Sequence, residues 1–338
     1  MAGGPKIAVL GAGSVGCFIG GAWAAAGLPV TLIGRPKISQ DVDAHGLTLS
    51  DYSGWEARLA PGDVDYRCGP EALDEAEIIV LTVKSGDTAE AAVQIAEHAN
   101  AGALVISFQN GVSNVDVLER GLRGRFEVAR GMVQYNVAYL GNGRFHKGVA
   151  GDLYVERRAG TRDLAESIGS GPAALKLSDQ MLALAWGKLL INLNNAVNAL
   201  SGRTLIEELK RCDYRRVFAA AMREGLDLLK EAEIEPVAAG SVPPSRLPRM
   251  IDAPDWLFNR FFLKRWKIDA KARSSMADDL AAGRKTEVEY INGELVRLAE
   301  RLQRAAPVNR AIVELIRKAE AGAKPLGPTA LRKATLGR

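Results

Sequence analysis

Short apolar runs alternate with amphipathic helical segments through the first half of the chain. Residues 78–83 and 104–108 are apolar almost throughout, which is typical of strands buried on both faces of a parallel sheet. The other segments of this pattern are strand-like at 6–10 and 29–33 and helical at 14–26 and 88–97. Strands that alternate with helices predict βαβ units with right-handed crossovers.

The pattern changes farther along the chain. Strand-like pieces at 128–137 and 153–156 predict a more antiparallel end to the sheet. After Ser178 helical patterns dominate, at 179–200, 214–232, 276–281, 287–304 and 310–321. We therefore predict three parts, an α/β domain at 1–178, an all-α domain at 179–322 and a flexible basic tail at 323–338.

Composition excludes several classes of protein. Of the 338 residues, 47% are apolar and 25% charged, as in soluble globular domains, so a disordered or fibrous chain is excluded. The net charge is +4, which four cations of the tail supply, so no basic face for a nucleic acid is indicated. These cations are Lys324, Arg332, Lys333 and Arg338.

Cysteine usage and hydropathy narrow the setting. Cys17, Cys68 and Cys212 are an odd number without metal-like spacing, so we expect no metal site and a reducing, cytoplasmic setting. No signal peptide is expected. The most apolar stretch, residues 182–200, contains a lysine and four asparagines, so we expect no membrane span.

A G-x-G-x-x-G motif follows the first predicted strand and opens the first predicted helix. Its glycines would allow a tight turn, a close approach of the backbone to a pyrophosphate, and packing of helix on strand, with the phosphate on free N–H groups. The alternative is an ordinary strand-to-helix turn, but this context favours dinucleotide binding by a Rossmann domain. The expected cofactor contacts are Gly11, Gly13, Ser14, Val15 and Gly16.

The end of the second predicted strand indicates which cofactor binds. A site for NAD places an acid there for the ribose 2′-hydroxyl, whereas a site for NADP places a cation for the 2′-phosphate. Here the strand ends at Gly34 and Arg35, with Lys37 beyond and no acid before Asp41. Arg35 is either a surface charge or a phosphate ligand, and the pattern favours NADPH.

A polar stripe runs along an otherwise apolar helical segment. Lys188, Asn192, Asn195 and Asn198 follow one another at spacings of four, three and three, which places them on one side of a helix, whereas Asn194 points elsewhere. The stripe is either solvated, part of a hydrogen-bond ladder between domains, or functional. In the functional interpretation partial burial lowers the pKa of Lys188, which becomes a proton donor, and the amides hold a polar substrate.

A second group of polar residues lies about 90 residues later. Thr286 and Glu289 have the spacing of a capping box, which would place Glu287 in the first turn of a helix. The helix dipole stabilises a carboxylate there, so Glu287 is either a favourable helix-start charge or part of a site.

Several motifs together resemble the ketopantoate reductases (2-dehydropantoate 2-reductases). The resemblance spans residues 6 to about 320, and its last motif is long and specific. The motifs are the glycine loop, Thr82-Val83-Lys84, Gln109-Asn110-Gly111, W-x-K-L-x-x-N at 186–192, and S-S-M…D…G-R-x-T-E-x-x-Y-I-N-G at 274–293.

The resemblance implies an α/β N-terminal Rossmann domain, an all-α C-terminal domain and an active site between them. It implies reduction of a 2-keto acid by NADPH, in the pathway to pantothenate and coenzyme A. Lys188 would be the general acid and Glu287 the carboxylate that helps position the reacting groups. Asn192 and Ser275 would bind substrate, while Arg35, Lys84 and Asn110 would contact the cofactor.

The chain departs from the family pattern after the lysine. Residue 196, where the family has a second asparagine, is alanine, and an Asn-Ala-Leu begins at Asn198. This indicates a two-residue insertion or a reshaped pocket, and it leaves the second substrate amide open between Asn195 and Asn198.

Two alternatives to ketopantoate reduction stay open. One is a related reductase of a different 2-keto acid, and the other is a non-catalytic NADPH-binding sensor, against which the presence of both Lys188 and Glu287 argues. A histidine-centred dehydrogenase is not expected, because no histidine lies in the helical half. The expected partner is a small-molecule 2-keto acid, without nucleic acid or membrane, and a homodimer is left open.

Overall fold

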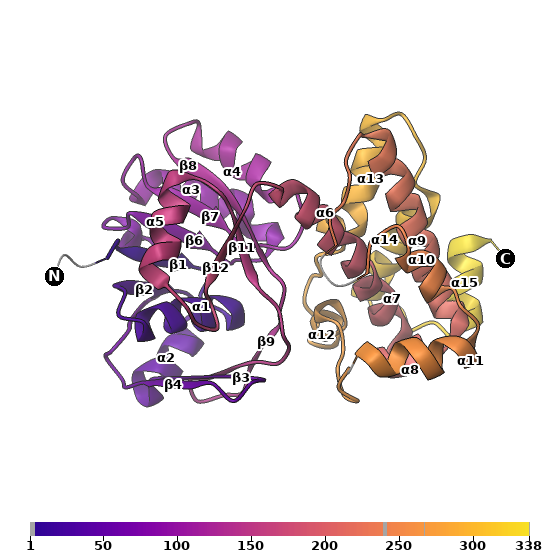
Figure 1. Cartoon of the computed structure of the whole chain (residues 1–338), viewed down its shortest axis with the longest axis horizontal. Helices are drawn as coiled ribbons and strands as arrows, with labels where there is room; N and C mark the ends of the chain where they lie inside the picture. The colour runs from indigo at the N-terminus through magenta and orange to yellow at the C-terminus, as the bar shows by residue number, and fades with distance from the viewer. Residues whose placement is uncertain (1–3, 239–241, 267, 338) are drawn as a thin grey trace. The chain divides into compact units, whose positions relative to one another are not determined.

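The computed structural model describes residues 4–238, 242–266 and 268–337 and divides into two compact units, Met1–Leu182 and Ala183–Arg338 (Figure 1). The division lies four residues beyond the boundary expected at Ser178. In the described part of the chain, every helix is too short or too polar to cross a lipid bilayer.

The first unit is built on an eight-stranded sheet in the order β12-β11-β8-β7-β6-β1-β2-β5. From β5 to β8 the strands are parallel and follow the strand order 3-2-1-4-5-6 of a dinucleotide-binding sheet. β8 and β11 pair antiparallel, so the α/β prediction and the more antiparallel end of the sheet are both confirmed. The strands are β1 Ile7–Leu10, β2 Val30–Ile33, β5 Asp65–Arg67, β6 Ile78–Leu81, β7 Leu104–Ser107, β8 Glu127–Val133, β11 Leu153–Glu156 and β12 Leu175–Ser178.

Helices cover both faces of this sheet (Figure 1). Successive residues of a strand point to opposite faces, so Ile7 and Val9 join one core while Ala8 and Leu10 join the other. The first core includes α1 (Ser14–Ala25) and α5 (Ala159–Ile168), and the second includes α3 (Thr88–His98) and α4 (Asn114–Leu122). Burial on both faces explains why these strands read as continuous apolar runs.

A four-stranded sheet, β4-β3-β10-β9, packs against α1, and the sequence patterns did not predict it. Its strands have three to five residues and are polar on one face, as in β3, where Leu47 and Leu49 are buried and Thr48 is not. The strands of this sheet are β3 Leu47–Asp51, β4 Glu56–Leu59, β9 Val137–Tyr139 and β10 Arg144–Lys147. The helix α2, Pro36–His45, precedes β3.

The second unit is helical, with one break inside the apolar segment expected as a single helix. α6 and α7 are separated only at Leu193, which keeps helical backbone angles (φ −56°, ψ −27°) and whose amide still donates to the carbonyl of Leu189 at 3.1 Å. The helices are α6 Met181–Asn192, α7 Asn194–Ser201, α8 Leu205–Leu209, α9 Cys212–Glu231, α10 Leu247–Ile251, α11 Asp255–Leu257, α12 Ser275–Ala281, α13 Asn292–Arg301, α14 Pro307–Glu320 and α15 Pro328–Leu336.

The prediction of a flexible tail is wrong. Residues 328–336 form α15, which packs against α9, and Leu331 is fully buried. The amide of Leu326 donates to the carbonyl of Leu200 at 2.8 Å, and the Arg332 guanidinium pairs with Asp213 at 3.0 Å. The tail has few apolar residues, but Leu331 and Thr335, four residues apart on one side of α15, are both buried.

We expect Leu331→Ala to destabilise the protein by about 2–4 kcal/mol, because removing a fully buried leucine side chain leaves a cavity. Urea-induced unfolding measures the change. Lys333→Ala is the matched control, since Lys333 is exposed on the same helix and its loss should cost about 0.5 kcal/mol or less. Equal effects of the two substitutions would contradict the packing of α15.

Candidate functional site

The glycine loop between β1 and α1 is held by bonds to its carbonyl groups. The Thr82 hydroxyl donates to the carbonyl of Gly11 at 2.9 Å, and the Tyr66 hydroxyl donates to the carbonyl of Ala12 at 2.9 Å. The Cys17 thiol also donates to Ala12, at 3.3 Å. The amides of Gly11 and Ala12 also donate to the carbonyl of Ile33, at 2.9 and 2.8 Å. The protein therefore fixes the loop through both its donors and its acceptors.

The N–H groups at the start of the following helix remain available as donors. Among the described residues, no hydrogen bond uses the amide N–H groups of Ser14, Val15 or Gly16, which open α1. Free N–H groups at the positive end of a 12-residue helix form a site for an anion such as a pyrophosphate.

The three glycines differ in the space around them. A Cβ atom at Gly11, where φ is +96°, would lie 2.5 Å from the amide nitrogen of Val83, and one at Gly16 would lie 2.6 Å from the Thr82 hydroxyl. A Cβ atom at Gly13 would meet nothing closer than 3.8 Å. The first and third glycines thus fit a tight turn and close packing, while the second leaves room for a bound group.

Arg35 stands where β2 ends and α2 begins, with its side chain exposed. The preceding Gly34 is enclosed, since a Cβ atom there would lie 2.2 Å from the Tyr66 hydroxyl and 2.9 Å from the carbonyl of Ala12. Arg35 is therefore the first side chain after β2 that can reach a ligand near the glycine loop.

Lys84 and Asn110 follow β6 and β7, whose carboxyl ends lie at the same edge of the sheet as the glycine loop. The carbonyl of Asn110 accepts hydrogen bonds from the Ser85 hydroxyl at 2.8 Å and from the Asn114 amide at 2.5 Å. The Gln109 amide donates to the carbonyl of Val83 at 3.2 Å. The two loops are thus tied together.

Ser85 and Asn114 are supporting residues that no sequence motif indicates. Both side chains are buried, together with those of Thr88 and Gln109. Their composition is ordinary for a loop and a helix start, so only the three-dimensional contacts reveal this network.

Lys188 and Glu287 are 99 residues apart in the sequence, and the fold of the second unit brings their charges together. Burial lowers the pKa of the Lys188 ammonium to about 8, and the Glu287 carboxylate acts in the opposite direction. Both side chains are half-buried. An ammonium group with this pKa gives up its proton near neutral pH far more readily than a solvated lysine.

The capping box expected at Thr286 and Glu289 is absent from this described segment. The Thr286 hydroxyl donates to Glu320 at 2.8 Å, and the Glu289 carboxylate pairs with Arg317 at 2.6 Å. Residues 288–290 form one 3₁₀ turn, and α13 begins only at Asn292. Glu287 therefore precedes a short turn and does not lie in the first turn of a long helix.

The expected substrate residues fall into two groups. Asn192 and Asn195 are half-buried and Ser275 is exposed at the start of α12, so all three have accessible surface. Asn198 is fully buried, and its side chain bonds the protein itself: its amide donates to the carbonyl of Arg203 at 3.2 Å, and its oxygen accepts from the amide of Ser274 at 2.9 Å.

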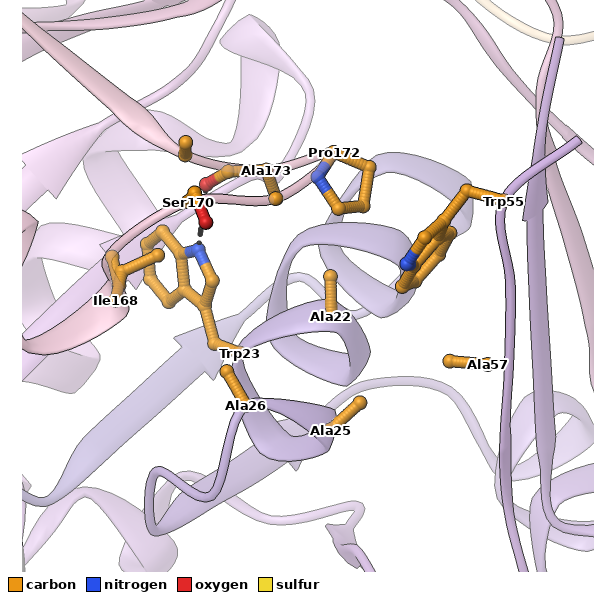
Figure 2. Close-up of a pocket in the computed structure, with 12 residues that line it drawn as sticks. Ala22, Trp23, Ala25, Ala26, Trp55, Ala57, Ile168, Ser170, Pro172 and Ala173 are labelled. Carbon is orange, nitrogen blue, oxygen red and sulfur yellow. Dashed lines mark hydrogen bonds between the residues drawn. The ribbon is translucent and has the colours of Figure 1, made fainter. Parts of the chain in front are cut away.

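A pocket of about 260 Å³ lies elsewhere, at the carboxyl end of α1 (Figure 2). Trp23 and Trp55 line it, and the Trp23 indole donates to the carbonyl of Ala173 at 2.9 Å. The glycine loop lies at the other end of α1, roughly 15 Å away at 1.5 Å per residue. The lining side chains carry no ionisable group, so the pocket offers no cation to a phosphate or carboxylate.

Two family models match the chain. One, described as ketopantoate reductase PanE/ApbA, matches residues 7–160, and the other, described as the C terminal of ketopantoate reductase PanE/ApbA, matches residues 180–320. Together they cover most of both units.

Individual proteins agree with these models. A 2-dehydropantoate 2-reductase of Pyrococcus abyssi is 28% identical over 94% of this chain and 98% of its own length. The crystal structure of a PanE/ApbA family ketopantoate reductase from Ralstonia eutropha matches with a TM-score of 0.80 and 29% identity, over 94% of this chain and 98% of that one. D-mandelate dehydrogenase with NADH and anilino(oxo)acetate matches in fold, with a TM-score of 0.76 at 20% identity, over 94% and 98% of the two chains.

Proposed function

Since the chain belongs to the ketopantoate reductase PanE/ApbA family and is an oxidoreductase, we propose that it reduces ketopantoate to pantoate with NADPH, using Lys188 as the general acid. The observation that carries the proposal is the lysine of lowered pKa beside Glu287 in the helical unit. A non-catalytic sensor of NADPH would have no use for such a proton donor.

The residues of the glycine loop fit a nicotinamide dinucleotide, because Gly13 leaves space where the free N–H groups of α1 begin. NADPH, when bound, supplies the hydride that reduces the keto carbon. We assign the pyrophosphate to the amides of Ser14, Val15 and Gly16, and the 2′-phosphate to Arg35. Lys84 and Asn110 are assigned to the remainder of the cofactor.

Lys188 donates its Nζ proton to the keto oxygen as negative charge develops there. A donor aimed at charge that appears only in the transition state lowers the barrier to the reaction. Glu287 holds the ammonium in its charged form, since its carboxylate raises the pKa of Lys188. Its second role is to orient the lysine toward the substrate.

We assign the polar groups of the substrate to Asn192, Asn195 and Ser275, whose side chains have accessible surface. Asn195 is favoured over Asn198 as the second amide, because the Asn198 side chain is buried and bonded to the protein. These amides and the hydroxyl bind without adding charge.

NADPH oxidation with ketopantoate, compared with a panel of other 2-keto acids that includes aromatic ones, tests the activity. The highest kcat/KM is expected with ketopantoate. A higher value with another acid would identify a related reductase, and binding of NADPH without turnover of any acid would identify a sensor. The homodimer left open by the sequence is tested by the molar mass in solution.

The pH profile of the reaction tests the proton donor. Lys188 must be protonated to donate, so we expect kcat/KM for ketopantoate reduction, which reports the free enzyme, to fall above about pH 8, and kcat/KM for pantoate oxidation to rise over the same range. Glu287→Gln removes a charge that raises the pKa of Lys188, so the falling limb should move to lower pH in that variant. A limb that stays in place in Glu287→Gln would contradict the pairing of the two residues.

A further inference from the structure

A buried carboxyl group lies behind the proposed substrate residues. α8 begins with a capping box in which the amide of Glu207 donates to the Thr204 hydroxyl and the amide of Thr204 donates to the Glu207 carboxylate. Glu207 is thereby held at the surface, and the next residue, Glu208, is turned inward and fully buried. Two neighbouring glutamates thus have opposite environments.

The hydrogen bonds of Glu208 are incomplete for a carboxylate. Its Oε2 accepts from the amide of Asn194 at 3.1 Å and from the amide of Asn198 at 3.5 Å. Its Oε1 is buried, and among the described residues it has no hydrogen-bond partner. The Oδ1 of Asn194 is buried without a partner as well. Glu208 and Asn194, which already share one hydrogen bond, thus each bury an acceptor without a donor. Burying an unpaired acceptor lowers the stability of the folded protein.

One proton satisfies both atoms. We propose that Glu208 is held as a neutral carboxylic acid whose Oε1–H donates to Asn194 Oδ1, and that this acid–amide pair positions the substrate residues of α7 and α12. A planar carboxylic acid and a primary amide form two antiparallel hydrogen bonds, and the Nδ2 to Oε2 bond is one of them.

The surrounding charges agree with a neutral acid. The facing cation is Arg215 of α9, which is fully buried. Its guanidinium donates to the carbonyls of Ile251, Leu209 and Ala253 and pairs with the Asp255 carboxylate at 2.9 Å. Arg215 is therefore already matched by Asp255. From α7 only the amides of Asn194 and Asn198 reach the carboxyl group.

Burial is the largest influence on the ionisation of Glu208. It raises the pKa to about 8, against the opposing effects of the Asn194 and Asn198 amides and of Arg215. The acid form therefore prevails at neutral pH.

The acid–amide pair is connected to the proposed site by a chain of hydrogen bonds. Asn198, which also donates to Glu208, accepts from the amide of Ser274 at 2.9 Å. The Ser274 hydroxyl donates to the carbonyl of Asn195 at 2.9 Å and accepts from the amide of Ala277 at 3.1 Å, which caps α12. Ser274 thus fixes the backbone of Asn195 and lies directly before Ser275, so Glu208 is a positioning residue. This role rests on the proposed function, whereas the protonation of Glu208 does not.

Glu208→Gln separates the neutral acid from a carboxylate, because glutamine keeps the shape and makes the same two bonds to Asn194 without a titratable proton. Between about pH 5 and 8 the native wild type binds a proton that the unfolded chain has released, so its stability falls as the pH rises. We therefore expect the difference in Tm, Glu208→Gln minus wild type, to increase by roughly 5 °C between pH 5 and 8. Above pH 8 this difference should stay constant. Glu207→Gln is the matched control, and its difference from the wild type should be constant with pH.

The effect on the site is read from the substrate KM. The ratio of the wild-type KM to that of Glu208→Gln should rise about threefold or more between pH 7 and 9, while the titration of Lys188 affects both proteins and cancels. A Tm difference that is independent of pH would overturn the neutral acid. A pH-dependent Tm difference with a constant KM ratio would overturn the positioning role alone, and absence of any turnover would overturn the proposed function and leave the acid intact.

A second measurement needs no variant. In the full-length wild type labelled with ¹³C at the glutamate carboxyl carbon, one signal is expected to titrate near pH 8. If every glutamate signal titrates below about pH 6, Glu208 is ionised at neutral pH and the proposal fails.

Discussion

Replacing Lys188 by alanine is expected to lower kcat for ketopantoate reduction by about 10²–10⁴-fold, the usual contribution of a positioned general acid. The alkoxide that forms on hydride transfer would then have to take its proton from water, without a fixed ammonium group to stabilise it. Steady-state NADPH oxidation at pH 7 measures the loss.

Binding of the cofactor separates this effect from a loss of structure. NADPH is assigned to the glycine loop and Arg35, so the Kd of Lys188→Ala, from quenching of the nucleotide fluorescence, should stay within about threefold of the wild type. Lys210→Ala is the matched control, since Lys210 is an exposed lysine of the same unit and should leave kcat unchanged. Turnover of Lys188→Ala close to that of the wild type would end the assignment of the general acid.

Replacing Arg35 by alanine is expected to raise the KM for NADPH by about 10–100-fold and the KM for NADH by less than about threefold. The difference arises because only NADPH carries the 2′-phosphate, and charge-assisted hydrogen bonds to such a group contribute about 1.5–3 kcal/mol. Initial rates with each cofactor, at saturating keto acid, give the two values.

Two further variants define what Arg35 contributes. Arg35→Lys keeps the charge without the two-pronged geometry and should lie between alanine and the wild type. Lys37→Ala removes a nearby exposed cation and should change the KM for NADPH much less. If Arg35→Ala affects NADPH and NADH equally, Arg35 is only a surface charge.

The α/β unit was predictable because its sequence signal is local. A strand such as β6 is apolar at every position, and the glycine loop follows β1 directly, so composition and spacing suffice. The four-stranded sheet was missed because β4 exposes half of its four residues and pairs with β3 over only four positions.

The helical unit shows where local patterns fail. The spacing of Thr286 and Glu289 satisfies the rule for a capping box. The Thr286 hydroxyl instead donates a hydrogen bond to Glu320 of α14, 34 residues away, and the helix begins only at Asn292. The spacing set Asn194 apart from the stripe, yet the side chains of Asn194 and Asn198 both donate to Glu208 Oε2, so Asn198 lies on the same side of α7 as Asn194. Asn198 faces Glu208 and Ser274, which no pattern around residue 198 reveals.

The crowding at Gly34 restricts how the cofactor preference of this enzyme can be redesigned. In Gly34→Asp the Cβ atom would clash with the Tyr66 hydroxyl and displace it, which would break its hydrogen bond to the carbonyl of Ala12. The substitution would therefore distort the glycine loop to which the cofactor is assigned. A switch toward NADH therefore has to be made at position 35, where the side chain projects freely, with Tyr66 left in place.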